Sequence, residues 1–276
     1  MIRVKQFAFY IICLNIFQHV HAQVINALPK PRHSFIVVSH RGDHTHAPEN
    51  TIQSFQNAIN DSADYVEIDL RTTIDSQLII MHDASVNRMT DGEGLIKDLT
   101  AEQIKKLKVK DKAHPEWGEF DIPFFKGVMQ LCKNKIYIYL DFKNADPSTV
   151  FKQIVELGMQ KQIVVYINNQ NQFYQWRKIA PTMPLMVSLP GNIKDTIGLN
   201  KFLQEVQPDI LDGSFEQYTI EMIHDAEQKG YLVLPDIQSI NERPELWDTA
   251  VQKGLHALQT DHPGALIDYL KAKKLR

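Results

Sequence analysis

The chain has 276 residues, with 30 Lys and Arg against 33 Asp and Glu, and its formal net charge is -3. No run of basic residues stands out along it, so the charge pattern argues against a protein that binds nucleic acid. There are no repeats, low-complexity tracts or long Gly/Ser linkers. These features favour one compact domain.

Residues 1–22 have the organisation of a secretory signal peptide. Arg3 and Lys5 precede the apolar run FAFYIICLNIF, and Val20-His21-Ala22 fits the small-residue cleavage pattern. The run is too short to form a stable membrane span. We therefore expect an exported protein, periplasmic or secreted, whose mature chain is residues 23–276. Its remaining cysteine, Cys132, is expected to be buried on a helix and has no partner for an internal disulfide.

Short apolar runs rich in β-branched residues recur along the mature chain and predict strands. They cover residues 35–39, 65–70, 78–81, 136–142, 163–167, 185–189, 209–211, 231–234 and 257–259. Helical patterns lie between most of them, at residues 51–60, 147–157, 171–178, 199–206, 219–229 and 244–253. Alternation of strands and helices predicts a parallel sheet.

The third of these nine strands cannot be parallel to the second. Only RTTIDSQ separates them, far less than the dozen or so residues that a parallel crossover requires, so the two form an antiparallel hairpin. A two-residue turn at Asp75-Ser76 would place Asp69 opposite His82. The eight remaining strands predict an α/β fold, a distorted (β/α)8 TIM barrel. Residues 83–125, rich in loop signals, are expected to form a small insertion over the barrel mouth.

Candidate functional side chains gather where the first three barrel strands and the hairpin end, which is the end of a barrel that carries the active site. In chain order they are His40, Arg41, Glu67, Asp69, His82, Asp141 and Lys143. The three carboxylates offer hard oxygen ligands, which suit one divalent cation, Mg²⁺ or Ca²⁺, with Mn²⁺ as an alternative. Two cationic side chains beside a metal are typical of a site for phosphate esters. Two histidines can then supply the base and the acid that cleavage of a phosphodiester requires.

An ordered set of motifs closely resembles the glycerophosphodiester phosphodiesterase family. The motifs are HRG, PENT, VEIDLRTTID, MHD, R-x-T-x-G-x-G, DLT and TDHP, and their order and spacing agree from about residue 36 to residue 268. The resemblance implies a distorted (β/α)8 barrel and metal-dependent hydrolysis of a small-molecule glycerophosphodiester to glycerol 3-phosphate and an alcohol. In related enzymes the hydroxyl of the glycerol can attack first and give a cyclic phosphate.

The resemblance also implies a role for each candidate residue. His40 and His82 are the acid/base pair, and Arg41 lies near the phosphate. Lys143 contacts the phosphate or orients a ligand. Glu67, Asp69 and Asp141 are metal ligands. Glu49 is an added ligand or a supporting carboxylate. The chain departs from the family at Asp141, where glutamate is common, and in YLVLPDIQS, which lacks the usual WTVN-like segment.

Alternative interpretations remain at this stage. In an amidohydrolase-like barrel, His44 and His46 would bind a metal, although Glu67 and Asp69 would then have no role. An exported phosphodiester-binding protein would not need the acid/base pair. Within the same fold, a phospholipase C/D-like enzyme could act on a lipid-linked head group, since substrate depth depends on loops. We interpret His44 and His46 as residues of a solvated loop near the substrate, Asp83 as a residue that holds its loop, and Asp261-His262 as a turn. The sequence indicates no oligomeric state.

Overall fold

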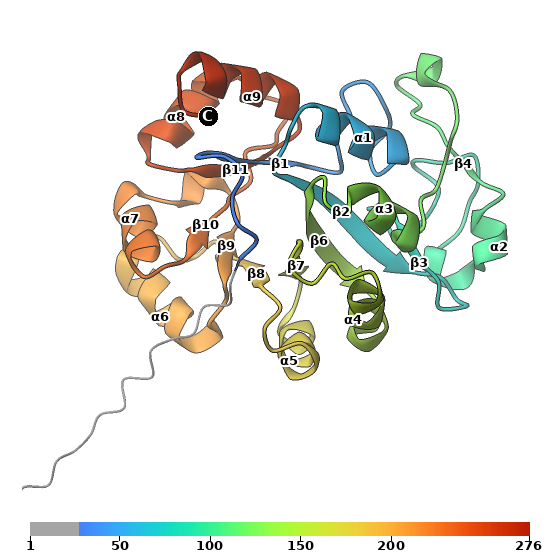
Figure 1. Ribbon diagram of the computed structural model, residues 1–276, viewed down its shortest axis with the longest axis horizontal. Coiled ribbons are helices and arrows are strands. Elements are labelled where there is room, and N and C mark those ends of the chain that lie inside the picture. The colour runs from blue at the N-terminus through green and yellow to red at the C-terminus, as the bar shows by residue number, and fades with distance from the viewer. Residues whose placement is uncertain (1–27) are drawn as a thin grey trace, which may run out of the picture.

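The structure is a computed structural model and describes residues 28–276; the signal peptide expected at residues 1–22 lies outside the described residues. Eight parallel strands form a ring surrounded by helices (Figure 1). In ring order they are β10 (Leu232–Val233), β9 (Ile210–Asp212), β8 (Leu185–Ser188), β7 (Ile163–Ile167), β6 (Tyr137–Asn144), β2 (Tyr65–Thr72), β1 (Ile36–Ser39) and β11 (Ala257–Thr260). The predicted barrel is therefore confirmed.

The ring closes between β10 and β11 through a single residue. The backbone of Asp236, just after β10, forms parallel bridges to Ser214 after β9 and to Gln259 of β11. The Ile237 N–H donates to the Gln259 carbonyl at 3.0 Å, and this bond continues the closure. The pairing that closes the barrel is thus shorter than the other strand pairings, and Asp236 lies at its centre.

The helices lie outside the ring and cover it. They are α1 (Ile52–Asn60), α3 (Phe125–Cys132), α4 (Pro147–Glu156), α5 (Gln170–Ile179), α6 (Thr196–Val206), α7 (Ile220–Gln228), α8 (Pro244–Gln252) and α9 (Pro263–Ala272). The six predicted helices are present, and Cys132 is buried on α3 as expected. We did not predict α9, which begins at Pro263, the last residue of TDHP.

Side chains alternate between the two faces of each barrel strand, as pleated strands require. One apolar layer fills the ring, and its buried members come from every barrel strand: Ile36, Val38, Tyr65, Tyr139, Val164, Met186, Ile210, Leu234 and Ala257. Outward residues such as Val37, Ile68 and Leu140 pack against the helices in a larger core. Because Glu67 and Asp69 follow Tyr65 at steps of two, they point into the barrel above this layer, on one face as predicted.

The hairpin between β2 and β3 (Leu78–Ile80) exists, but its predicted register is wrong. The pairs are Leu70 with Ile80 and Thr72 with Leu78, which places Asp69 opposite Met81 rather than His82. The Met81 N–H donates to the Asp69 carbonyl at 2.9 Å. Ser76 takes a left-handed conformation, with φ 61°, and makes the loop three residues long instead of two.

The insertion after the hairpin has its own small core. It contains η1 (Ile96–Asp98), α2 (Ala101–Ile104), β4 (Lys108–Val109), η2 (Pro115–Trp117) and β5 (Phe120–Asp121), and β4 pairs antiparallel with β5. Buried Ile79, Val86, Ile96, Ile104 and Ile122 pack together there. Figure 1 shows this segment extending sideways from β3.

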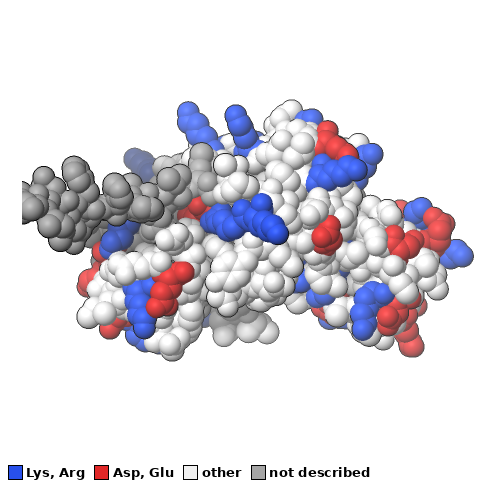
Figure 2. Space-filling view, turned by 90° about the horizontal axis from the view of Figure 1, so that it is seen from below, with Lys and Arg blue, Asp and Glu red and all other residues white. Residues whose placement is uncertain are grey.

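The surface shows mixed charge. Acidic and basic side chains are interspersed over the face drawn in Figure 2, with neutral residues between them. No helix among residues 28–276 is both long and apolar enough to cross a membrane.

Candidate active site

A polar cavity of about 140 Å³ opens at the carboxyl end of the barrel. All seven residues chosen from strand ends line it: His40, Arg41, Glu67, Asp69, His82, Asp141 and Lys143. They come from β1, β2, β6 and the end of β3. Their convergence follows from the parallel arrangement, which brings strand ends together.

Three carboxylates form the centre of one wall. Each of Glu67, Asp69 and Asp141 offers an oxygen atom, and these oxygens all lie within 4.8 Å of one another. The arrangement follows from the strands, because Asp69 pairs in register with Asp141 across β2 and β6. Asp141, although shorter than the glutamate common at this position, therefore reaches the other two acids.

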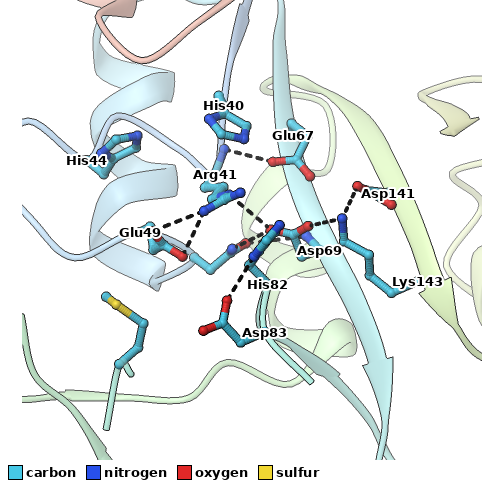
Figure 3. Close-up of polar contacts among 12 residues, drawn as sticks. His40, Arg41, His44, Glu49, Glu67, Asp69, His82, Asp83, Asp141 and Lys143 are labelled. Carbon is cyan, nitrogen blue, oxygen red and sulfur yellow. Dashed lines mark hydrogen bonds and ion pairs between the residues drawn. The ribbon is translucent and has the colours of Figure 1, made fainter. Parts of the chain in front are cut away.

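Two cationic side chains balance part of this negative charge (Figure 3). The Lys143 Nζ lies 3.1 Å from Asp69 Oδ1 and 2.5 Å from Asp141 Oδ2, and the Arg41 Nε lies 3.5 Å from Asp69 Oδ2. Burial would raise the pKa of Asp69, but Lys143 and Arg41 outweigh it and lower that pKa. The charge of the third acid remains without an equivalent cation.

Glu67 shows the effect of that imbalance. Burial raises the pKa of its carboxyl well above the ordinary value, and the neighbouring charges of Asp69 and Asp141 raise it further. A bound divalent cation would offset both effects, since it would supply positive charge to the three carboxylate oxygens. The donor set thus fits Mg²⁺, Ca²⁺ or Mn²⁺.

The loop after β1 is shaped to bring Arg41 to these acids. Arg41 has φ 54°, and its backbone N–H donates to Glu67 Oε2 at 2.8 Å. Gly42 follows with φ 81°, and a Cβ there would lie 2.5 Å from Ser54 Oγ and 2.7 Å from the Ser54 backbone. Only glycine fits this position. Asn50, also in this loop, donates from Nδ2 to Asp69 Oδ2 at 2.7 Å.

Glu49 lies between two arginines rather than among the three clustered carboxylates. Arg41 Nη1 lies 3.2 Å from both of its oxygens, and Arg88 Nη2 lies 2.6 Å from Oε1. Burial opposes ionisation of Glu49, but the Arg88 hydrogen bond and the Arg41 charge lower its pKa overall. This placement suits a carboxylate that orients Arg41. Arg88, from the insertion, is the residue that links that segment to the site.

His82 is held by the next residue along the chain. Its Nδ1 lies 2.9 Å from Asp83 Oδ1, while Arg88 donates from Nε to Asp83 Oδ2 at 2.7 Å. The Arg88 bond, followed by that of His82, holds the pKa of Asp83 well below its usual range. Asp83 therefore holds the loop, as predicted, and also fixes the ring of His82.

His40 has a matching partner that sequence reasoning missed. Its Nδ1 lies 2.7 Å from Asp261 Oδ1, and the same oxygen lies 3.1 Å from His44 Nε2. Burial opposes ionisation of Asp261, but the two histidines lower its pKa overall. The interpretation of Asp261 as a turn residue was incomplete. Its position directly after β11 was the available signal, since His40 and Arg41 likewise follow β1 directly.

His44 is half-buried and hydrogen-bonded, so its description as a solvated loop residue was incomplete, whereas His46 is exposed. His40, His44 and Asp261 could together hold a metal, but His46 is not part of that group among residues 28–276. The pair that an amidohydrolase-like site requires is therefore not assembled.

The opposite wall of the cavity was not predicted. Six further residues line it: Tyr139, Tyr166, Asp212, Asp236, Gln238 and Gln259. Five of them occupy inward positions of barrel strands or of their direct continuations, and following each strand at steps of two, through its apolar run and just past it, would have found them.

Comparison with known proteins gives a consistent result. The model of the glycerophosphoryl diester phosphodiesterase family matches residues 40–265. A glycerophosphodiester phosphodiesterase of Caldanaerobacter subterraneus is 27% identical over 252 residues, which cover 86% of this chain and 98% of that protein. One of Bacillus subtilis is 29% identical over 168 residues, 54% of this chain and 57% of that protein.

Two solved structures share the fold. The Oleispira antarctica phosphodiesterase in complex with the product sn-glycerol-3-phosphate has a TM-score of 0.73 and 21% identity, and the match covers 86% of this chain and 96% of that one. The glycerophosphodiester phosphodiesterase of Agrobacterium tumefaciens has a TM-score of 0.71 and 20% identity, with 84% and 99% covered.

Proposed function

Because the chain belongs to the glycerophosphoryl diester phosphodiesterase family, we propose that it hydrolyses glycerophosphodiesters to glycerol 3-phosphate and an alcohol, using His40 and His82 as acid and base. The observation that carries this proposal is the convergence of two histidines, three carboxylates and two cations on one cavity. These are the groups that hydrolysis of a phosphodiester requires.

The two histidines divide the proton transfers. Each ring uses Nδ1 to bond an aspartate, Asp261 for His40 and Asp83 for His82, which leaves Nε2 as the nitrogen available to the substrate. One histidine accepts the proton of the attacking hydroxyl at Nε2, and the other donates a proton from Nε2 to the leaving oxygen. The aspartates keep the rings oriented and stabilise the imidazolium form.

The phosphate lies against the cationic side of the cavity. Arg41 and Lys143 neutralise charge on its non-bridging oxygens, and Glu49 keeps the Arg41 guanidinium directed into the site. A divalent cation held by Glu67, Asp69 and Asp141 would supply further charge neutralisation on those oxygens when bound.

A second cavity supports a lipid substrate as the alternative. It measures about 320 Å³, lies between α5 and α6, and shares Tyr166 with the first cavity. Phe173, Val187 and Phe202 give it an apolar lining. A single acyl chain fits such a lining, so a lysophospholipid belongs among the substrates to be assayed.

The test is the release of glycerol 3-phosphate by the purified protein from glycerophosphodiesters and from a lysophospholipid, with and without Mg²⁺, Ca²⁺ or Mn²⁺. We expect turnover of the glycerophosphodiesters to require a cation and to be lost in both His40→Ala and His82→Ala, while folding and metal binding persist. Full activity of either variant would remove the acid/base assignment. Turnover after complete chelation would remove the carboxylate metal site.

We also propose that the protein is exported and cleaved after Ala22, on the strength of the sequence of residues 1–22. Mass spectrometry of the N-terminus from a secreted or periplasmic fraction checks this. An intact Met1 on the mature protein would contradict it.

A further inference from the structure

The wall opposite the phosphate site contains three buried acceptors that lack a hydrogen-bond donor. Among residues 28–276, Asp212 Oδ1, Gln238 Oε1 and Gln259 Oε1 have no hydrogen-bond partner. All three residues line the active-site cavity. They come from β9, from the segment after β10 and from β11, which are neighbours in the ring (Figure 1).

The surrounding contacts fix which atoms remain unpaired. Gln259 donates from Nε2 to Asp236 Oδ1 at 2.7 Å, and the Gln238 amide also donates to Asp236. Both amide nitrogens are therefore used, and both amide oxygens are left. Asp212 accepts from Ser188 Oγ at 3.0 Å through Oδ2, and Ser188 is bonded in turn to Tyr166 at 2.8 Å. The Asp212 carboxyl also interacts with the Gly213 backbone N–H and with the Asp236 carboxyl, and its Oδ1 is the third acceptor that no donor reaches with hydrogen-bond geometry.

Buried acceptors without donors are rare in folded proteins, because each one has lost its hydrogen bonds to water. Asp212 is 2% exposed and Gln259 is 4% exposed. Three such atoms on one wall of a substrate cavity indicate a ligand that brings several donors.

The wall also carries two neighbouring carboxyl groups, Asp212 and Asp236, whose ionised form a bound cation would favour. Burial, followed by the charge of Asp236, raises the pKa of Asp212 well above its usual range, and burial also raises the pKa of Asp236. The two lysine and arginine side chains of the cavity, Arg41 and Lys143, are paired with acids of the opposite wall. A hydroxyl offers one donor and no charge, whereas a primary ammonium offers three donors and a positive charge.

We propose that Asp212, Gln238 and Gln259 bind a primary ammonium group, so that the preferred substrates are phosphodiesters whose head group is an amino alcohol with a free –NH₃⁺. The proposal rests on the proposed function, because it places the head group in the same cavity as the phosphate. Asp236 acts as the positioning residue, since it holds both amides. A trimethylammonium group has no N–H, leaves the three acceptors unpaired and is disfavoured.

The test compares kcat/KM for glycerophosphoethanolamine, glycerophosphocholine and glycerophosphoglycerol. We expect a preference for the ethanolamine ester over the choline ester of about tenfold or more. Gln238→Met and Gln259→Met keep the shape of the side chain but remove the acceptor, and each should bring that ratio toward one. Gln217→Met makes the same change in a glutamine outside the cavity lining and should leave the ratio unchanged.

A wild-type ratio near one, or a ratio unaffected by both cavity variants, would overturn the proposal. Calorimetric titration with phosphoethanolamine and phosphocholine gives a readout that does not need turnover. Discrimination in binding without hydrolysis of any substrate would remove the proposed function and keep the ammonium site. Hydrolysis of the substrates combined with equal binding of phosphoethanolamine and phosphocholine would keep the proposed function and remove the ammonium site.

Discussion

Asp261→Asn tests whether the residue behind His40 positions it for proton transfer. The Asp261 carboxylate accepts from His40 Nδ1 at 2.7 Å, and it does not line the cavity. Asparagine keeps the shape but removes the charge, and its amide nitrogen can donate to Nδ1. The imidazole then carries its proton on Nε2, where it cannot accept the proton of a hydroxyl.

The expected loss follows from the contact. A hydrogen bond to a charged group contributes about 1.5–3 kcal/mol, and Asp261 is 26% exposed, which favours the lower part of that range. At 1.36 kcal/mol per tenfold in rate, the lower half of that range corresponds to a fall in kcat of about 10- to 50-fold. KM should change little, because the substrate does not contact Asp261. Steady-state hydrolysis of a glycerophosphodiester at saturating metal measures both constants.

His44→Gln is the matched control, because it changes the other partner of the same carboxylate oxygen and leaves the bond between His40 and Asp261 in place. We expect kcat within about threefold of the native value, because the glutamine amide can still donate to Asp261 and the bond between Asp261 and His40 remains. Native-like kcat in Asp261→Asn would refute the positioning role. Equal losses in the two variants would instead indicate that His40, His44 and Asp261 act as one unit, as they would around a metal ion.

Three further predictions concern metal, backbone and pH. Burial and nearby acids raise the pKa of Glu67, so a cation that binds there must displace a proton from this carboxyl. The affinity of the protein for Mg²⁺, measured by calorimetry, should therefore rise with pH. An affinity that does not depend on pH would contradict this prediction. Gly42→Ala should lower the free energy of unfolding in urea by about 2–5 kcal/mol, because residue 42 has a positive φ and the new Cβ would lie 2.5 Å from the Ser54 side-chain oxygen in α1. Gly127→Ala is the control, since a Cβ at Gly127 has no other atom within 4 Å, and it should not lower that free energy. The hydrogen bond from Arg88 lowers the pKa of Asp83, so the charged carboxylate stabilises the folded protein at neutral pH. Asp83→Asn should therefore lower the free energy of unfolding at pH 7, and the difference from the native protein should shrink as the pH falls below 3.8. A difference that persists in acid would show that the charge of Asp83 is not the cause.

Most of the fold could be predicted because its elements depend on local patterns. The limits of the nine strands lie within two residues of the predicted ones, since each strand is a compact apolar run. The predicted TDHP turn instead leads straight into α9. Pro263 is the first residue of that helix, a position that favours proline, so the signal for a helix was present.

The hairpin register could not be predicted in the same way. Thr73 and Gln77 close the loop, and the extra residue is accommodated because Ser76 takes a left-handed conformation. Serine has no strong preference for that conformation, so the sequence gives no warning of a three-residue loop. The error moved the residue paired with Asp69 by one position, yet His82 still reached the cavity because it lies at the very end of the returning strand.

The site was predicted on one wall and missed on the other for a geometric reason. In each barrel strand the inward apolar residue is followed, two positions later, by the residue that lines the cavity or supports it. The pairs are Val38 and His40, Tyr65 and Glu67, Tyr139 and Asp141, Val164 and Tyr166, Met186 and Ser188, Ile210 and Asp212, Leu234 and Asp236, and Ala257 and Gln259. The strands predicted at 209–211 and 231–234 stop just before Asp212 and Asp236, so these acids were not assigned to the barrel interior.

The two-residue spacing also separates the apolar residues that pack inside the barrel from the polar residues that line the cavity. The apolar layer excludes water below the cavity and fixes the strands, while the next inward position of each strand faces the substrate. One wall carries the groups proposed to cleave the phosphodiester, and the other, built from β9 to β11, carries the acceptors proposed to bind the head group.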